Sequence, residues 1–350
     1  MRTGVLVLLA TAFVAAGSAS GGDIASVALG RGPCCVAVVG GTLWIGEHRS
    51  GRVVELDPHS GKVLWSITVP NQAIDYGSLV GAYGALWVYG NLGAATGLVR
   101  IDPKTHSVRH VAGVPDVSGL VPLDGKLWAS TDSGPFLYRI DPGSARLEAR
   151  LKVRGRASYE LGAAADGALW CAAVNAGQTT SGDPNSVTVR IDPAGKIVKS
   201  LQPFGSGPYG ALAGVRSIAA VGNAIWETQQ DDSAGPGVAS TVLRIDAKTG
   251  RVTLRMRPKV QGNGDAFPDV MTAGDGTLWL QTRPTALERI DPTTGRIMRT
   301  IAIPLDHKRP LTDYWNSSIA AGLGSDWITV WPGQGGPSDK STGKLISVPS

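Results

Sequence analysis

A segment centred on a tryptophan recurs seven times along this chain. The first copy is Gly41-Thr-Leu-Trp-Ile-Gly46, followed by Val53-Val-Glu-Leu-Asp57, a short turn and an apolar run that ends at Trp65. A repeat of about 40–50 residues that holds several short strands is the signature of a β-propeller. We therefore predict an all-β fold, a seven-bladed β-propeller of four-stranded meander blades. The repeated tryptophans, spaced by 43, 41, 42, 56, 53 and 48 residues, are Trp44, Trp87, Trp128, Trp170, Trp226, Trp279 and Trp327.

Each repeat predicts four strands in the same order. The first strand ends at a glycine-rich turn, the second carries the tryptophan, the third ends in Asp-Pro, and the fourth follows the glycine of the next turn. In such turns the carboxylate accepts from backbone N–H groups, proline fixes φ and glycine permits positive φ, so we assign these aspartates a structural role. The third-strand copies are 55–58, 100–103, 139–142, 190–193, 244–247 and 289–292.

The two ends of the chain predict how the ring closes. The seventh repeat stops at residues 343–350, which align with a third strand, so this repeat lacks a fourth strand. Residues 24–29 form an additional strand before the first repeat. Pairing of the two ends would complete the last blade and remove the exposed sheet edges. Deletion of residues 23–30 should then destabilise the whole domain and not merely fray one end.

The first residues have the pattern of a secretory signal peptide. Met1-Arg-Thr3 leads into an apolar run over 5–16, and small residues follow over 17–22. The apolar run is too short to span a bilayer as a helix. We predict a signal peptide over 1–19 and one propeller domain over 20–350. The expected mature protein is exported to the periplasm or the extracellular space, does not span the membrane, and is a monomer.

Composition argues against a nucleic-acid partner. The formal net charge is +5, from 33 Lys and Arg against 28 Asp and Glu, but the basic residues are scattered without a cluster of five or more. We interpret them as a solvated surface. The chain contains no GxSxG, HExxH, Walker or EF-hand pattern, so its sequence requires no cofactor.

Loop lengths predict where a ligand would bind. In a meander blade, the first-to-second and third-to-fourth turns lie on one face, and these turns are short throughout. The second-to-third loops and the connections between blades lie on the other face and vary widely in length, as in 172–186, 203–217 and 228–240. Variable loops on a rigid scaffold commonly carry function. We therefore expect the ligand face on the long-loop side, over the central channel.

Several residues are candidates for this face. The positions ten residues before each tryptophan should ring the channel mouth: Cys34, Gly77, Ser118, Glu160, Arg216, Asp269 and Ser317. Glu160, Arg216 and Asp269 either bind a polar ligand or form an internally paired ion cluster. His48 and His307 lie in long-face loops, where a histidine is either a general base or simply exposed. His59 and His106, in the short turns, are expected to be solvated.

The three cysteines do not form a zinc site as spaced. Cys34 and Cys35 are adjacent and either form a vicinal disulfide or stay reduced, both of which suit an exported protein. Cys171 is expected to be buried and separate from this pair. No residue is assigned as a metal ligand.

The repeat resembles known families. Its pattern of Leu-Trp-Val followed by Arg-Ile-Asp-Pro-x-Thr-Gly, over 24–350, resembles the YVTN/NHL-type secreted seven-bladed propellers and is similar to the streptogramin (virginiamycin B) lyase superfamily. Those lyases linearise a cyclic depsipeptide with a histidine base and magnesium, and Leu43-Trp-Ile-Gly-Glu47 resembles one of their elements. A second resemblance is to pyrroloquinoline quinone enzymes, through the Asp57 to Trp65 segment and the Cys34-Cys35 pair.

Together these features lead us to expect an exported binding or interaction module without catalysis. Its partner would be a small molecule, a peptide, a carbohydrate or another protein. One alternative is a lyase or hydrolase that uses His48 or His307 with a divalent metal. A remote alternative is a pyrroloquinoline quinone-binding propeller.

Overall fold

The computed structural model describes fifteen ranges of the chain: 25–47, 50–68, 79–89, 97–115, 117–131, 134–156, 158–174, 186–201, 214–230, 241–258, 269–272, 276–283, 286–302, 314–332 and 342–349. The predicted signal peptide lies outside these residues, so it and the start of the mature domain stay predictions. Within the described ranges, no helix is long and apolar enough to cross a membrane.

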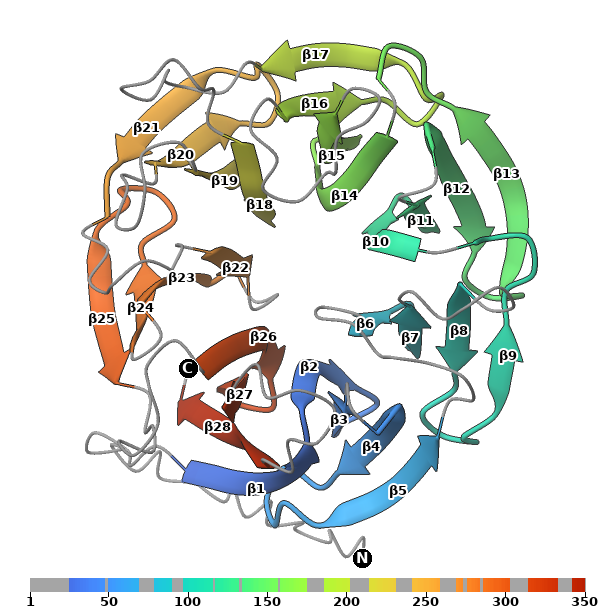
Figure 1. Cartoon of the computed structure of the whole chain (residues 1–350), viewed down its shortest axis with the longest axis vertical. Helices are drawn as coiled ribbons and strands as arrows, with labels where there is room; N and C mark the ends of the chain where they lie inside the picture. Colours follow the sequence, from blue (N-terminus) through green and yellow to red (C-terminus); the bar gives the residue numbers. More distant parts are fainter. Residues whose placement is uncertain are drawn as a thin grey trace, which may run out of the picture.

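Seven antiparallel sheets of four strands stand around a common centre, as Figure 1 shows, which confirms the seven-bladed β-propeller. Blades 1 to 3 comprise β2 (Pro33–Val39), β3 (Thr42–Glu47), β4 (Arg52–Leu56) and β5 (Val63–Thr68); β6 (Leu79–Ala82), β7 (Ala85–Tyr89), β8 (Leu98–Ile101) and β9 (Val108–His110); and β10 (Val117–Leu123), β11 (Lys126–Thr131), β12 (Phe136–Asp141) and β13 (Arg146–Lys152).

Blades 4 to 6 follow the same order. They comprise β14 (Ser158–Ala165), β15 (Ala168–Val174), β16 (Val187–Ile191) and β17 (Ile197–Leu201); β18 (Gly214–Val221), β19 (Ala224–Gln230), β20 (Thr241–Asp246) and β21 (Val252–Met256); and β22 (Asp269–Thr272), β23 (Leu278–Arg283), β24 (Ala286–Ile290) and β25 (Ile297–Ala302). The first strand of each blade lies nearest the centre of the ring and the fourth lies on the outer rim (Figure 1).

Blade 7 is built from both ends of the chain, as the sequence predicted. It holds β26 (Tyr314–Gly322), β27 (Ser325–Pro332) and β28 (Thr342–Pro349), and β1 (Ala25–Arg31) is its outer strand. β1 pairs antiparallel with β28, from Ala25 opposite Ser347 to Ala28 opposite Lys344. Val27 and Leu29 pack against a core cluster that draws its residues from blades 1 and 7. The ring is therefore closed by hydrogen bonds and by apolar contact.

The repeated tryptophans fill the spaces between blades. Six of them are at most 2% exposed, and Trp327 is 6% exposed. Each cluster around a tryptophan draws on neighbouring blades: Trp44 packs with Leu86 and Val88 of blade 2. Large apolar side chains at one repeated position thus supply much of the inter-blade core, as expected for aromatic packing.

The repeated aspartates are turn residues, in agreement with their predicted structural role. Asp57 accepts hydrogen bonds from the backbone N–H groups of His59 and Ser60, at 3.0 and 2.7 Å. Asp291 accepts in the same way from Thr293 and Thr294, at 2.8 and 3.0 Å. Hydrogen bonds to the ionised carboxylate lower the pKa of both groups. The carboxylate oxygens of these aspartates thus accept hydrogen bonds within their own turns.

The innermost strands approach closely enough to require glycine at Gly119. A Cβ atom built at this position would lie 2.5 Å from the carbonyl oxygen of Leu161 and 2.9 Å from its nitrogen. These are backbone atoms of β14 in the next blade, so they cannot move aside as a side chain would. The close approach also lets Ser130 Oγ accept a hydrogen bond of 3.0 Å from the Leu161 N–H.

We expect Gly119→Ala to lower the free energy of unfolding by about 3 kcal/mol, the upper part of the range for overpacked interiors. The added methyl group would push β10 away from β14 and weaken the Ser130 bond. Chemical denaturation of both proteins measures the difference. Gly125→Ala is the matched comparison for steric crowding, because a Cβ at Gly125 meets no atom within 4 Å; its cost should come from its positive φ of 72° alone. Equal stability of Gly119→Ala and the natural protein would contradict the close approach.

Candidate functional site

Three of the predicted ligand-face residues lie on adjacent inner strands. Glu160 is in β14 opposite Ala172, and Asp269 begins β22 opposite Gln281. Arg216 lies in β18, the strand between them. The structure describes the backbone of these positions and not their side chains. His48 and His307 lie outside the described residues, and so does Gly77.

Several of the positions ten residues before a tryptophan coincide with β-bulges. The pairing register shifts around Cys34 in β2, Ser118 in β10, Arg216 in β18 and Ser317 in β26. In β14 the shift falls at Gly162 instead. A bulge inserts one extra residue and re-aims the side chains beside it. We predicted these positions at the channel mouth and counted 203–217 as a loop, whereas the structure has Arg216 in β18. The bulges were not predicted.

Hydroxyl groups of the preceding blade accept hydrogen bonds from the backbone next to these bulges. Val215 N donates to Ser186 Oγ at 2.7 Å, just as Leu161 N donates to Ser130 Oγ. Both serines are fully buried. Because a buried N–H without a partner is costly, these bonds keep the irregular inner strands in place.

Cys34 and Cys35 form the disulfide that the sequence left open. Both residues are fully buried in β2, so the bond does not face solvent as a channel-mouth group would. Cys171 is buried in β15 and does not take part in this disulfide. Among the described residues, no three His, Cys, Asp or Glu side chains are grouped to hold a metal ion.

A histidine that we expected to be solvated instead joins two blades. His106 Nε2 lies 2.8 Å from Glu55 Oε2 of blade 1, and its ring stacks on Trp65 with centroids 4.5 Å apart. The expectation of a solvated His106 was therefore wrong. His106 ends the turn that begins at Asp102 and has a positive φ of 57°, and its ring lies against the neighbouring blade. The spacing of residues within one repeat cannot reveal a contact between blades.

A carboxyl group is buried between blades 4 and 5. Glu227 is 1% exposed and accepts from Thr188 Oγ1 and, at 2.6 Å, from Gln229 Nε2. Burial raises the pKa of Glu227 to about 7, an effect that the two hydrogen bonds only partly offset. We did not predict this residue. A signal was present, because the position after the tryptophan is apolar in the other repeats, as in Ile45 and Leu280.

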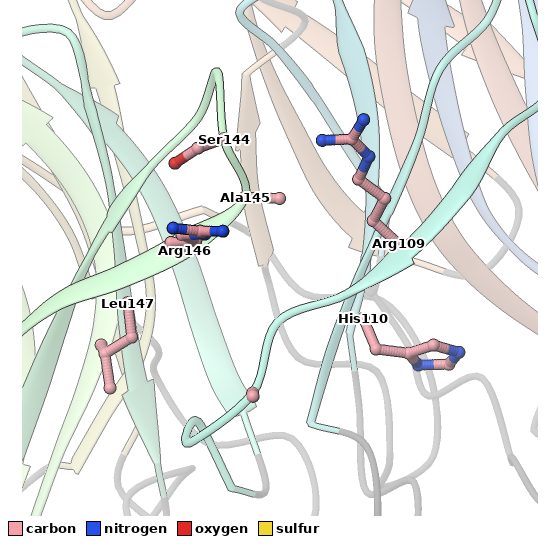
Figure 2. Close-up of a pocket in the computed structure, with 7 residues that line it drawn as sticks. Arg109, His110, Ser144, Ala145, Arg146 and Leu147 are labelled. Carbon is pink, nitrogen blue, oxygen red and sulfur yellow. The ribbon is translucent and has the colours of Figure 1, made fainter.

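An open cleft of about 580 Å³ lies on the outer rim between blades 2 and 3. It is lined by Arg109, His110, Ala112, Ser144, Ala145, Arg146 and Leu147. Figure 2 shows Arg109 and His110 on one wall, and Ser144, Ala145 and Arg146 on the other. This cleft could not be located from the sequence, because its walls come from two different repeats.

Comparisons with known proteins place the chain among propellers. A family model described as outer membrane protein assembly factor BamB matches residues 11–111, which is under a third of the chain. No curated protein matches the chain. Among solved structures, it is similar to Kuenenia stuttgartiensis hydrazine synthase, with a TM-score of 0.64 and 14% identity over 89% of this chain and 95% of that chain.

It is also similar to the WD40 β-propeller domain of Doa1, with a TM-score of 0.56 and 14% identity, covering 92% of this chain and 95% of that chain. At this identity the likeness shows the fold alone. The comparisons therefore support the propeller fold, and the YVTN/NHL and lyase-like assignments stay predictions.

Proposed function

We propose that this protein is an exported, non-catalytic binding or interaction module whose ligand face lies on the long-loop side of the ring. The observation that carries this proposal is the placement of Glu160, Arg216 and Asp269 on three adjacent inner strands. Glu160 and Asp269 each pair with the residue two positions after the tryptophan of their blade, and Arg216 lies at the bulge of β18 between the partners of Thr228 and Gln229, so the three stand at similar heights. Charged residues on adjacent strands of a rigid scaffold suit the recognition of a polar partner.

The scaffold supports this reading. β1 and β28 close the ring, and serine hydroxyls hold the irregular inner strands in register across blades. A preorganised frame loses little freedom when a partner binds, and this favours affinity. The partner would be a small molecule, a peptide, a carbohydrate or another protein. The match to an outer membrane assembly factor supports a place outside the cytoplasm and a protein partner.

A thermal-shift screen of the mature protein tests the proposal. The panel holds magnesium, calcium, pyrroloquinoline quinone, cyclic depsipeptides and oligosaccharides, each measured with the natural protein, Glu160→Ala and His48→Ala. A ligand at 100 times its dissociation constant should stabilise the fold by about 2.7 kcal/mol. Lys104→Ala, in an exposed turn on the opposite face, is the control.

A shift that needs no metal, is lost in Glu160→Ala and persists in Lys104→Ala would support a binding module. A metal-dependent shift lost in His48→Ala, together with cleavage of a cyclic depsipeptide, would overturn it in favour of the lyase. Stabilisation by pyrroloquinoline quinone would favour the remote alternative.

A further inference from the structure

We propose that the rim cleft between blades 2 and 3 is a second binding site, which takes a ligand bearing an oxyanion. The site lies away from the ring centre, between the end of β9 and the turn that joins β12 to β13. It is independent of the proposed ligand face. The ligand chemistry is a phosphate, a sulfate or clustered carboxylates.

The first support is uncompensated positive charge. Within the described part of the chain, Arg109 and Arg146 have no ion pair, whereas Arg100, Arg139 and Arg190 each have a carboxylate partner. The two cleft arginines come from different blades and are exposed. Two guanidinium groups that line one open space raise the positive potential there, and this favours the entry of an anion.

The acidic groups next to the cleft are already engaged. Asp141 lies opposite Arg146 in the β12–β13 pairing, but its Oδ2 accepts from the Ser144 N–H at 2.8 Å and its Oδ1 lies 3.5 Å from Lys126 Nζ. Glu148 pairs with Lys126 and with Arg139. The hydrogen bonds that Asp141 accepts lower the pKa of its carboxyl, and those from Ser144 have the largest effect. Nearby carboxylates are therefore committed to other cations, which leaves Arg146 available to a ligand.

The wall of the cleft formed by Ser144, Ala145 and Arg146 is firmly held. The hydrogen bonds to Asp141 fix the turn. Ala145 has a positive φ of 54°, at a position where most repeats have glycine. Its side chain is 5% exposed and packs into the core of blades 2 and 3. Leu147 adds an apolar surface to the same wall. The volume of about 580 Å³ falls in the range of small-molecule sites.

The arrangement of donors selects the ligand class. A guanidinium group presents a planar set of N–H donors that matches the oxygens of a phosphate, sulfate or carboxylate. Figure 2 shows the Arg109 side chain extending toward the turn of Ser144 and Ala145, while His110 points the other way, as strand alternation requires. Arg109 and Arg146 are therefore the binding residues that we assign. A ligand with two or more negative oxygens would contact both.

Calorimetric titration with inorganic phosphate, inorganic sulfate and citrate tests the site and separates tetrahedral oxyanions from polycarboxylates. We expect the natural protein to bind at least one probe at millimolar concentration or below, more weakly as salt rises. Arg109→Gln and Arg146→Gln should each weaken binding by about tenfold, as for loss of a charged hydrogen bond, and the double variant should abolish it.

Arg299→Gln is the matched control, because Arg299 lies opposite Arg289 on the outer strand of blade 6 as Arg109 lies opposite Arg100 in blade 2. It should bind the probe as the natural protein does, and so should Glu160→Ala, which separates this site from the proposed ligand face. Circular dichroism checks that each variant is folded. No binding of any probe by the natural protein, or equal binding by the double variant, would overturn the proposal.

Discussion

Removal of residues 23–30 is expected to destabilise all seven blades together. The deletion takes away most of β1, leaves the hydrogen-bonding edge of β28 unpaired, and uncovers the core cluster that Val27 and Leu29 cover. Because each blade packs against two neighbours in the closed ring, opening it at one blade weakens the inter-blade packing around the whole circle. The free energy of unfolding should fall by roughly 4 kcal/mol or more, in the range of severe structural lesions.

Chemical denaturation followed by tryptophan fluorescence measures this loss, and hydrogen exchange locates it. A chain that begins at residue 23 is the control, since it keeps β1 and should match the longer chain in stability. The expected result is reduced protection in blades far from the closure, such as blade 4. Loss of protection confined to β26, β27 and β28 would show that the closure is a local contact and would contradict the prediction.

Glu227→Gln is expected to stabilise the protein at neutral and alkaline pH and to flatten its pH dependence. The pKa of Glu227 is about 7 in the folded protein, against an ordinary value of 4.5. Between these values the folded state keeps a proton that the unfolded chain has released. The contribution of this group to stability is therefore fully present below about pH 4.5 and is lost as pH rises through about 7.

The size of the effect follows from the same shift. One pKa unit corresponds to about 1.4 kcal/mol, so the loss above pH 7 is about 3 kcal/mol. Glutamine keeps the shape and can bond to both Thr188 and Gln229 without ionising. The variant should therefore resemble the natural protein at pH 4 and exceed its stability by about 3 kcal/mol at pH 8.

Denaturation curves at several pH values measure this difference. Glu288→Gln is the comparison, because it makes the same chemical change at a partly buried glutamate on β24. A difference between Glu227→Gln and the natural protein that stays constant from pH 4 to pH 8 would contradict the assignment.

The candidate site was predictable only in outline. Counting back from the tryptophans predicted Glu160, Arg216 and Asp269 at the channel mouth, and the structure has all three in the first strands of their blades. The bulges at several equivalent positions could not be predicted from the spacing of residues along the chain, since a bulge depends on how the neighbouring blade packs. The sequence left two redox states open for Cys34 and Cys35, and the structure has the disulfide.

By itself, the sequence determined the seven blades, the four strands in each, the turn role of the aspartates and the pairing of the chain ends. These features rest on local periodicity and turn chemistry, and the same pattern occurs in each repeat. The tertiary structure alone decided the buried carboxyl group of Glu227, the contact of His106 with Glu55, and the cleft between Arg109 and Arg146. Each of these joins residues of two blades, and the distance between blades is set by how their faces pack, not by the spacing of residues along either strand.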